Sequence, residues 1–196
     1  MKPAKVVALH RADTTGGVSL SDEALVAACG VGDPAALGAL YDRHHAQVRR
    51  FVTRLTRAAD VDDLVHDTFL TASSAAARFR GGSTVRTWLL GIAANATRHA
   101  ARAGHRRRAL AEAFAHREPA ASTTPEDAVR RAELRERIAD AIAALPHDIR
   151  VAFVMCDLED VKGADAARAL GLPEGTVFRR CHDARRALRE ALGGMR

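Results

Sequence analysis

The stretch that decides the fold is ADAARALGLPEGTVFRRCHDARRAL, residues 164–188. Its first part, 164–171, carries small residues and ends at Gly171, a residue type that suits the left-handed conformation at the end of a helix. The next four residues, 172–175, predict a tight turn, and residues 176–191 predict a longer helix. Four residues of that helix recur at the spacing of one helical face and are expected to point inward: Val177, Cys181, Ala184 and Leu188.

A short helix, a tight turn and a longer helix make a helix-turn-helix, which places the first half of its second helix in the DNA major groove. The residues expected to face outward there are Thr176, Phe178, Arg179, Arg180, His182 and Asp183. Arginine pairs with guanine edges and holds phosphates, so these positions suit DNA. An ordinary helical hairpin with a solvated arginine face is the alternative interpretation.

The composition of the 196-residue chain favours an anionic partner. The formal net charge is +6, and only three of the 30 Lys and Arg residues are lysines. No run of apolar residues is long enough for a membrane span, and the N-terminus lacks the apolar core of a secretory signal. Three widely spaced cysteines argue against a disulfide scaffold. We therefore expect a cytoplasmic protein without membrane insertion.

Apolar residues recur at helical spacing almost throughout the chain, whereas strict alternation is hard to find. Asp33 followed by Pro34 is a strong helix start, and the apolar stripe that follows runs to Leu55. The sequence predicts an all-α protein with two small helical domains joined by a flexible linker, the second being the helix-turn-helix domain. The expected boundaries are a disordered tail at 1–20, a first domain at 21–104, a linker at 105–125 and a second domain at 126–196.

Two stretches of the first half carry opposite charge. Residues 58–77 contain four aspartates and no Lys or Arg, whereas residues 98–117 contain six arginines and one glutamate. The simplest interpretation is a pair of solvated faces. The functional interpretation gives the acidic stretch a basic protein partner and the basic stretch a nucleic acid.

No cluster of residues in the sequence indicates catalysis, a metal site, a cofactor or a small-molecule substrate. Cys181, His182 and Asp183 are neighbours on one predicted helix and therefore cannot face one another. Cys156 and Cys181 fall on apolar faces and are expected to be buried thiols. Whether these two or Cys29 sense redox state stays open. We expect no enzymatic activity.

Four segments resemble, in order along the chain, conserved segments of the extracytoplasmic-function (ECF) RNA polymerase sigma factors. Residues 62–70, DDLVHDTFL, are similar to that family's core-polymerase-binding helix, usually EDLVQDVFL. The family's promoter-melting helix is similar to a second segment, which contains Phe79, Trp88-Leu89 and the IAAN of residues 92–95.

The other two segments lie in the second predicted domain. The start of the family's second DNA-binding domain is similar to the segment with Leu145-Pro146, Arg150 and Phe153-Val154. The recognition unit of that domain is similar to LGLPEGTV at residues 170–177. The resemblance covers about residues 21–192. It implies a promoter-specificity subunit that binds core RNA polymerase and promoter DNA, and family members are commonly held inactive by an anti-sigma factor.

The resemblance also implies three groups of site residues. The polymerase-binding group is Asp62, Asp63, Leu64, Val65, His66, Asp67 and Phe69. The group for the −10 promoter element, where a base is flipped from the non-template strand, is Arg80, Ser83, Arg86, Asn95, Arg98 and Arg102. The group for the −35 element is Gly175, Thr176, Phe178, Arg179, Arg180, His182 and Arg185.

Several positions depart from the family pattern. His66 stands where glutamine is usual, Ser73 where tryptophan is common, and Asp183 where arginine is frequent. The promoter sequence that the family prefers is therefore not transferred to this chain. The alternatives to a sigma factor are a dimeric helix-turn-helix regulator without a polymerase role, which leaves the acidic helix unexplained, and a helical enzyme or interaction module.

Overall fold

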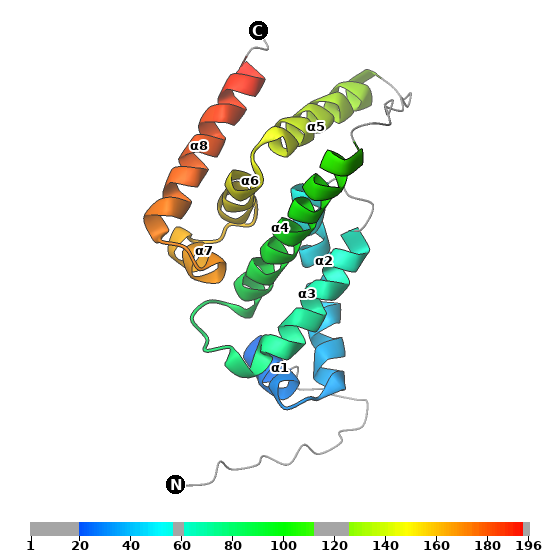
Figure 1. Cartoon of the computed structure of the whole chain (residues 1–196), viewed down its shortest axis with the longest axis vertical. Coiled ribbons are helices and arrows are strands. Elements are labelled where there is room, and N and C mark those ends of the chain that lie inside the picture. Colours follow the sequence, from blue (N-terminus) through cyan, green and yellow to red (C-terminus); the bar gives the residue numbers. More distant parts are fainter. Residues whose placement is uncertain (1–19, 57–60, 112–125, 194–196) are drawn as a thin grey trace.

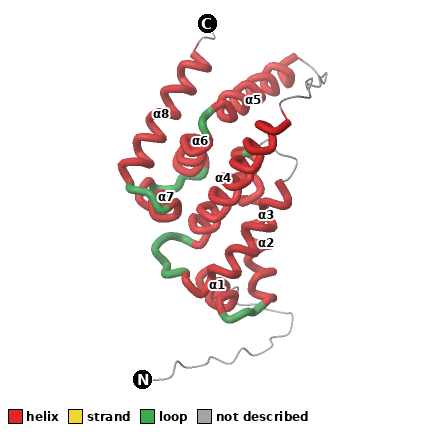
Figure 2. Tube along the Cα trace, in the orientation of Figure 1, coloured by secondary structure: helices red, strands yellow, loops and turns green. Residues whose placement is uncertain are grey.

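The computed structural model describes residues 20–56, 61–111 and 126–193, and these residues contain helices and no strand (Figure 2). The first domain is built from α1 (Asp22–Gly30), α2 (Pro34–Leu55), α3 (Val61–Ala75), the short 3-10 helix Ala76–Arg78 and α4 (Val85–Ala111). The second contains α5 (Glu126–Ala144), α6 (His147–Phe153), the π-helical turn Val154–Leu158, α7 (Gly163–Leu170) and α8 (Glu174–Gly193). The predicted all-α fold with two helical domains is confirmed.

Helix α2 forms the centre of the first domain. It begins where the sequence predicts, because the Asp33 carboxylate accepts hydrogen bonds from the Ala35 and Ala36 amides at 2.8 and 3.4 Å. Its predicted stripe faces the core, and Phe51 and Val52 are fully buried against α3 and α4. The His44 ring, also buried, lies 2.9 Å from the Asp22 carboxylate and so ties α2 to α1.

The helix-turn-helix is formed by α7 and α8. Gly171 ends α7 at φ 65°, a left-handed conformation that glycine adopts without steric cost. The four residues of α8 predicted to point inward are all buried. Before the helix-turn-helix, α6 is followed by a π turn, after which the Glu159 amide donates a hydrogen bond to the Val154 carbonyl at 3.0 Å.

The two domains lie side by side, with α7 of the second packed against α4 of the first (Figure 1). The contact is close at Gly91. A Cβ atom there would lie 2.6 Å from the Ala169 carbonyl oxygen, so only glycine lets the two backbones approach this far. We call this packing the closed arrangement.

Helix α4 continues to Ala111, beyond the start of the expected linker at 105. The rest of that linker, residues 112–125, and all but the last residue of the expected N-terminal tail lie outside the described residues. The domain boundaries therefore stay predictions. None of the helices in the described ranges is long and apolar enough to cross a membrane.

Replacing the cap of α2 tests the local origin of this fold. Asp33→Ala should lower the free energy of unfolding by about 1 kcal/mol, because two amides at the start of α2 lose their acceptor. Urea denaturation followed by circular dichroism measures the change. The control is Asp42→Ala, an exposed aspartate further along α2, which should leave the midpoint unchanged. Equal midpoints for both variants would contradict the capping role.

Candidate nucleic-acid and protein interfaces

Helix α3 presents an acidic face to solvent. Of the residues that the resemblance places at the polymerase, Asp62, Asp63, His66 and Asp67 are exposed. The other three, Leu64, Val65 and Phe69, are buried in the first domain and hold α3 in place. Leu70, which ends the matched segment 62–70 but is not among the expected site residues, is 49% exposed beside this face. The sequence could have indicated this residue, because Leu70 is a leucine that lies one position outside the apolar stripe of α3.

The residues expected at the −10 element lie on the loop before α4 and along α4. Thr84 fixes the start of this helix, since its hydroxyl oxygen accepts a hydrogen bond of 3.1 Å from the Thr87 amide. Trp88 packs half-buried on the core, with its ring centroid 4.9 Å from that of Phe79. Arg80, Asn95 and Arg102 are exposed and Ser83 is half-buried.

Two arginines of this group are bound by the second domain. Arg86 Nη2 donates to the Glu159 carboxylate at 2.9 Å and to the Glu159 carbonyl at 2.8 Å. Arg98 Nε donates to the Asp148 carboxylate at 3.2 Å. The structure therefore brings these two arginines of the −10 group against the second domain, a juxtaposition that the sequence did not predict.

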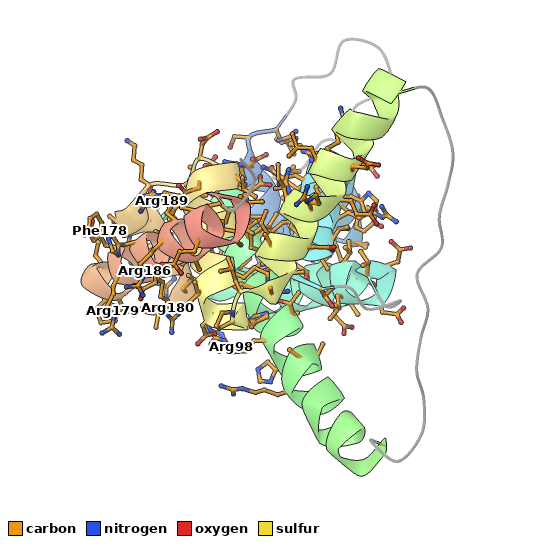
Figure 3. The ribbon with its side chains drawn as sticks, turned by 90° about the horizontal axis from the view of Figure 1, so that it is seen from above. Arg98, Phe178, Arg179, Arg180, Arg186 and Arg189 are labelled. Atoms are coloured by element: carbon orange, nitrogen blue, oxygen red, sulfur yellow. The ribbon has the colours of Figure 1, made fainter. Side chains whose placement is uncertain are left out.

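Helix α8 carries the exposed face expected at the −35 element (Figure 3). Phe178 is 73% exposed, and Gly175, Arg179 and His182 are also on the surface. Thr176 is half-buried, and Arg185 pairs with Asp157 at 2.7 Å. The sequence analysis did not assign Arg186 and Arg189, which are exposed further along the same helix.

Arg180 differs from the other arginines of this face. Its Nη2 donates to Asp148 Oδ2 at 3.0 Å, while Arg98 occupies Oδ1 of the same carboxylate. Figure 3 shows both arginines on the same side of the molecule, Arg98 from α4 and Arg180 from α8. One carboxylate thus joins a residue of the −10 group to a residue of the −35 group.

Comparison with known proteins adds a sequence relationship to this geometry. Residues 40–108 match the family model for Sigma-70 region 2, and residues 135–188 match that for Sigma-70, region 4. The ECF RNA polymerase sigma factor SigM of Mycobacterium tuberculosis H37Rv is 36% identical, over 88% of this chain and 85% of its own. The ECF RNA polymerase sigma-E factor of Haemophilus influenzae is 32% identical, over 85% of this chain and 92% of its own.

The chain belongs to the ECF sigma factor family. It is an alternative sigma factor that binds core RNA polymerase and directs promoter-specific initiation of transcription. The solved structure of CnrH in complex with the cytosolic domain of CnrY is similar in fold, with 27% identity and a TM-score of 0.65 over 89% of this chain and 99% of that one. RpoE of Bartonella quintana, solved with the anti-sigma factor NepR, shares the fold with a TM-score of 0.60 and 24% identity, over 77% of this chain and 92% of that one.

Two of the three cysteines of this sigma factor meet between the π turn and α8. A hydrogen bond to Cys181, together with burial, raises the pKa of the Cys156 thiol, and the same bond lowers the pKa of Cys181. Cys29 is buried in the first domain, and burial raises its pKa. Within the described part of the chain, no three His, Cys, Asp or Glu side chains form a group that would hold a metal ion.

His147 of this sigma factor lies at the domain contact, where its Nε2 is 3.1 Å from the Thr97 hydroxyl of α4. Burial lowers the pKa of His147, and the charge of Arg150 lowers it further against the opposite effect of Asp148. The folded chain therefore favours the neutral ring. As the pH falls below 6.5, the unfolded chain takes up this proton first, so stability decreases.

Urea denaturation at a series of pH values tests this assignment. The free energy of unfolding of the wild type should decrease as the pH is lowered from neutrality through 6.5, and His147→Gln should lose part of that decrease. His182→Gln is the matched control, because His182 is exposed on α8. A His147→Gln variant with the full pH dependence of the wild type would show that another group is responsible.

Proposed function

We propose that this sigma factor divides its contacts among three surfaces, one for the polymerase and two for the promoter. The observation that carries the proposal is the separation of charge. The acidic face lies on α3 of the first domain, whereas exposed basic residues lie on α4 and α8. A protein partner and a DNA partner can therefore be held at the same time without competing for one surface.

The polymerase surface is the exposed face of α3. Asp62, Asp63 and Asp67 offer carboxylates to basic side chains of core RNA polymerase, and Leu70 adds an apolar contact at their edge. The buried members of the expected group act indirectly, by anchoring α3 in the first domain. Asp62 is already paired with Arg49 at 3.0 Å, which leaves Asp63 and Asp67 as the principal charges.

The −10 surface is the loop before α4 and the adjoining part of that helix. Gly81 has φ 69° and exposed surroundings, so the loop backbone can approach an extruded base closely. Asn95 and Arg102, two turns apart on α4, suit base edges and phosphates. Arg86 and Arg98 join this surface once they leave their carboxylate partners.

The −35 surface is the first half of α8. Arg179 points into solvent and suits a guanine edge in the major groove, and the exposed ring of Phe178 suits a thymine methyl group. Arg186 and Arg189 extend the positive charge along the helix toward phosphates.

An anti-sigma factor is the expected regulator of this chain. Two proteins that share its fold were solved with a partner: RpoE with the anti-sigma factor NepR, and CnrH with the cytosolic domain of CnrY. Here an apolar groove of about 480 Å³ runs between the domains, and Ile138, Ile142 and Leu158 line it beside Arg54 and Arg135. The lining suits an amphipathic helix that carries acidic residues.

We further propose that the protein acts in the cytoplasm and catalyses no reaction itself, since its role is to position polymerase on DNA. Run-off transcription with purified core RNA polymerase and a pool of genomic promoter fragments tests the function. Promoter-dependent transcripts should appear only when this chain is added. Transcripts that do not depend on the chain would contradict the proposal, and duplex binding without polymerase binding would favour a plain helix-turn-helix regulator.

The acidic face makes a specific prediction for polymerase binding. The double substitution Asp63→Asn and Asp67→Asn should weaken binding to core RNA polymerase roughly tenfold, because two exposed ion pairs of about 0.7 kcal/mol each are lost. Fluorescence anisotropy of the labelled chain measures this. Asp42→Asn is the control, since Asp42 is an exposed aspartate of α2 that is not assigned to this face. Unchanged affinity in the double variant would remove α3 from the polymerase interface.

The exposed arginine of α8 makes a prediction for promoter choice. Arg179→Ala should reduce run-off transcription from a selected promoter and relax the preference for one base of the −35 element, by about 1–3 kcal/mol of discrimination. Transcription from templates with single-base changes in that element measures the preference. Arg189→Ala, at the far end of the helix, should weaken all templates alike. A uniform loss with Arg179→Ala would assign this residue to phosphate instead.

A further inference from the structure

Glu159 is a buried carboxylate whose hydrogen-bond donors, among the described residues, all come from the other domain. It is only 5% exposed. On α2, Gln47 Nε2 and Arg54 Nη1 donate to it at 2.9 and 2.5 Å, and Arg86 of α4 donates to both its carboxylate and its carbonyl. A carboxylate taken out of water in this way is stable only while its cationic partners stay in place.

The backbone around Glu159 is shaped to present it. The π turn Val154–Leu158 widens the end of α6, and the amides of Glu159 and Val161 bond back to it at 3.0 Å. Asp160 follows with φ 52°, a left-handed conformation that is uncommon for residues other than glycine. The carboxylate is therefore held toward the first domain by its own backbone.

Three further contacts cross the same boundary. Asp148 of α6 accepts from Arg98 of the first domain while it also holds Arg180 of its own. Arg150 donates to the Leu55 carbonyl at the end of α2 at 2.8 Å. Gly91 and Ala169 let α4 and α7 approach closely beside these polar contacts.

We propose that the sigma factor inhibits itself: in the closed arrangement, Glu159 and Asp148 occupy arginines that promoter DNA needs. This inference rests on the proposed function, which assigns Arg86 and Arg98 to the −10 surface and Arg180 to the −35 surface. The two carboxylates act as internal stand-ins for phosphate, since a guanidinium binds either group through the same pair of N–H donors. Closure and DNA binding therefore exclude one another at these three side chains.

The two carboxylates differ in how easily DNA displaces them. The side chain of Asp148 is 44% exposed, so water screens its ion pairs. Arg180 is also poorly satisfied, because its buried Nη1 has no hydrogen-bond partner among the described residues. Glu159 is buried and fully engaged. DNA thus displaces Asp148 first, and release of Glu159 limits opening.

A substitution at Gly91 tests closure without touching any charge. In Gly91→Ala the added methyl group meets the Ala169 carbonyl oxygen at 2.6 Å, and because this is a backbone atom, α7 must shift away from α4. Alanine also favours the helical conformation, so α4 itself should remain folded. Gly38→Ala in α2 is the matched control, because a Cβ atom there meets nothing within 4 Å.

Small-angle X-ray scattering of the full chain measures closure in the absence of DNA. We expect a larger radius of gyration for Gly91→Ala than for the wild type and for Gly38→Ala, with unchanged helical content by circular dichroism. The combination of Glu159→Gln and Asp148→Asn should expand the chain as well, because it removes both carboxylate charges. If neither the steric nor the charge variant expands the chain, the proposal is wrong.

Binding to a fluorescein-labelled DNA duplex of mixed sequence measures the consequence. Binding to such a duplex measures arginine–phosphate contacts, which do not depend on the promoter sequence. Both opened variants should bind about tenfold more tightly than the wild type, because the binding-competent fraction rises. Gly38→Ala should bind as the wild type does. Expansion of the chain without tighter DNA binding would show that the proposed self-inhibition is wrong. Run-off transcripts with the wild-type chain would show that its function as a sigma factor is unaffected by that result.

Discussion

The domain packing depends on the buried carboxylate of Glu159. Removal of a carboxylate from water is strongly unfavourable unless cations and hydrogen-bond donors replace the solvent. Here two guanidinium groups and one amide do so, and all three belong to the other domain. Neither domain alone offers Glu159 this environment. The carboxylate therefore makes closure specific, since any other packing of the two domains leaves it buried without partners or returns it to water.

Arginine suits the two roles proposed for Arg86, Arg98 and Arg180 better than lysine does. A planar guanidinium binds a carboxylate and a phosphate in the same geometry, whereas a lysine ammonium acts as a point charge. Arg86 donates to two acceptors of Glu159 at once, and Asp148 holds Arg98 and Arg180 on its two oxygens. The chemistry that suits these residues to DNA is what allows the protein's own acids to hold them.

The sequence predicts what local spacing determines. The cap at Asp33, the stripe of α2, the left-handed Gly171 and the inward face of α8 all depend on residues within a few positions of one another, and all are confirmed. The contacts of Glu159 join residues that are 73 to 112 positions apart, and the spacing of apolar residues along the sequence does not predict such contacts. The π turn is likewise not predicted by local spacing, since it positions Glu159 for partners in the other domain.

On the proposed assignment of surfaces, the placement of the acidic face sets the order in which the two partners can bind. Asp63 and Asp67 are exposed on α3 while the domains are closed. Arg86, Arg98 and Arg180 are engaged in that same state. A closed chain thus presents the proposed polymerase surface but withholds part of the proposed promoter surface. Contact with polymerase can therefore precede contact with DNA, and this order keeps a positively charged protein from being held on non-promoter DNA before it has joined the enzyme.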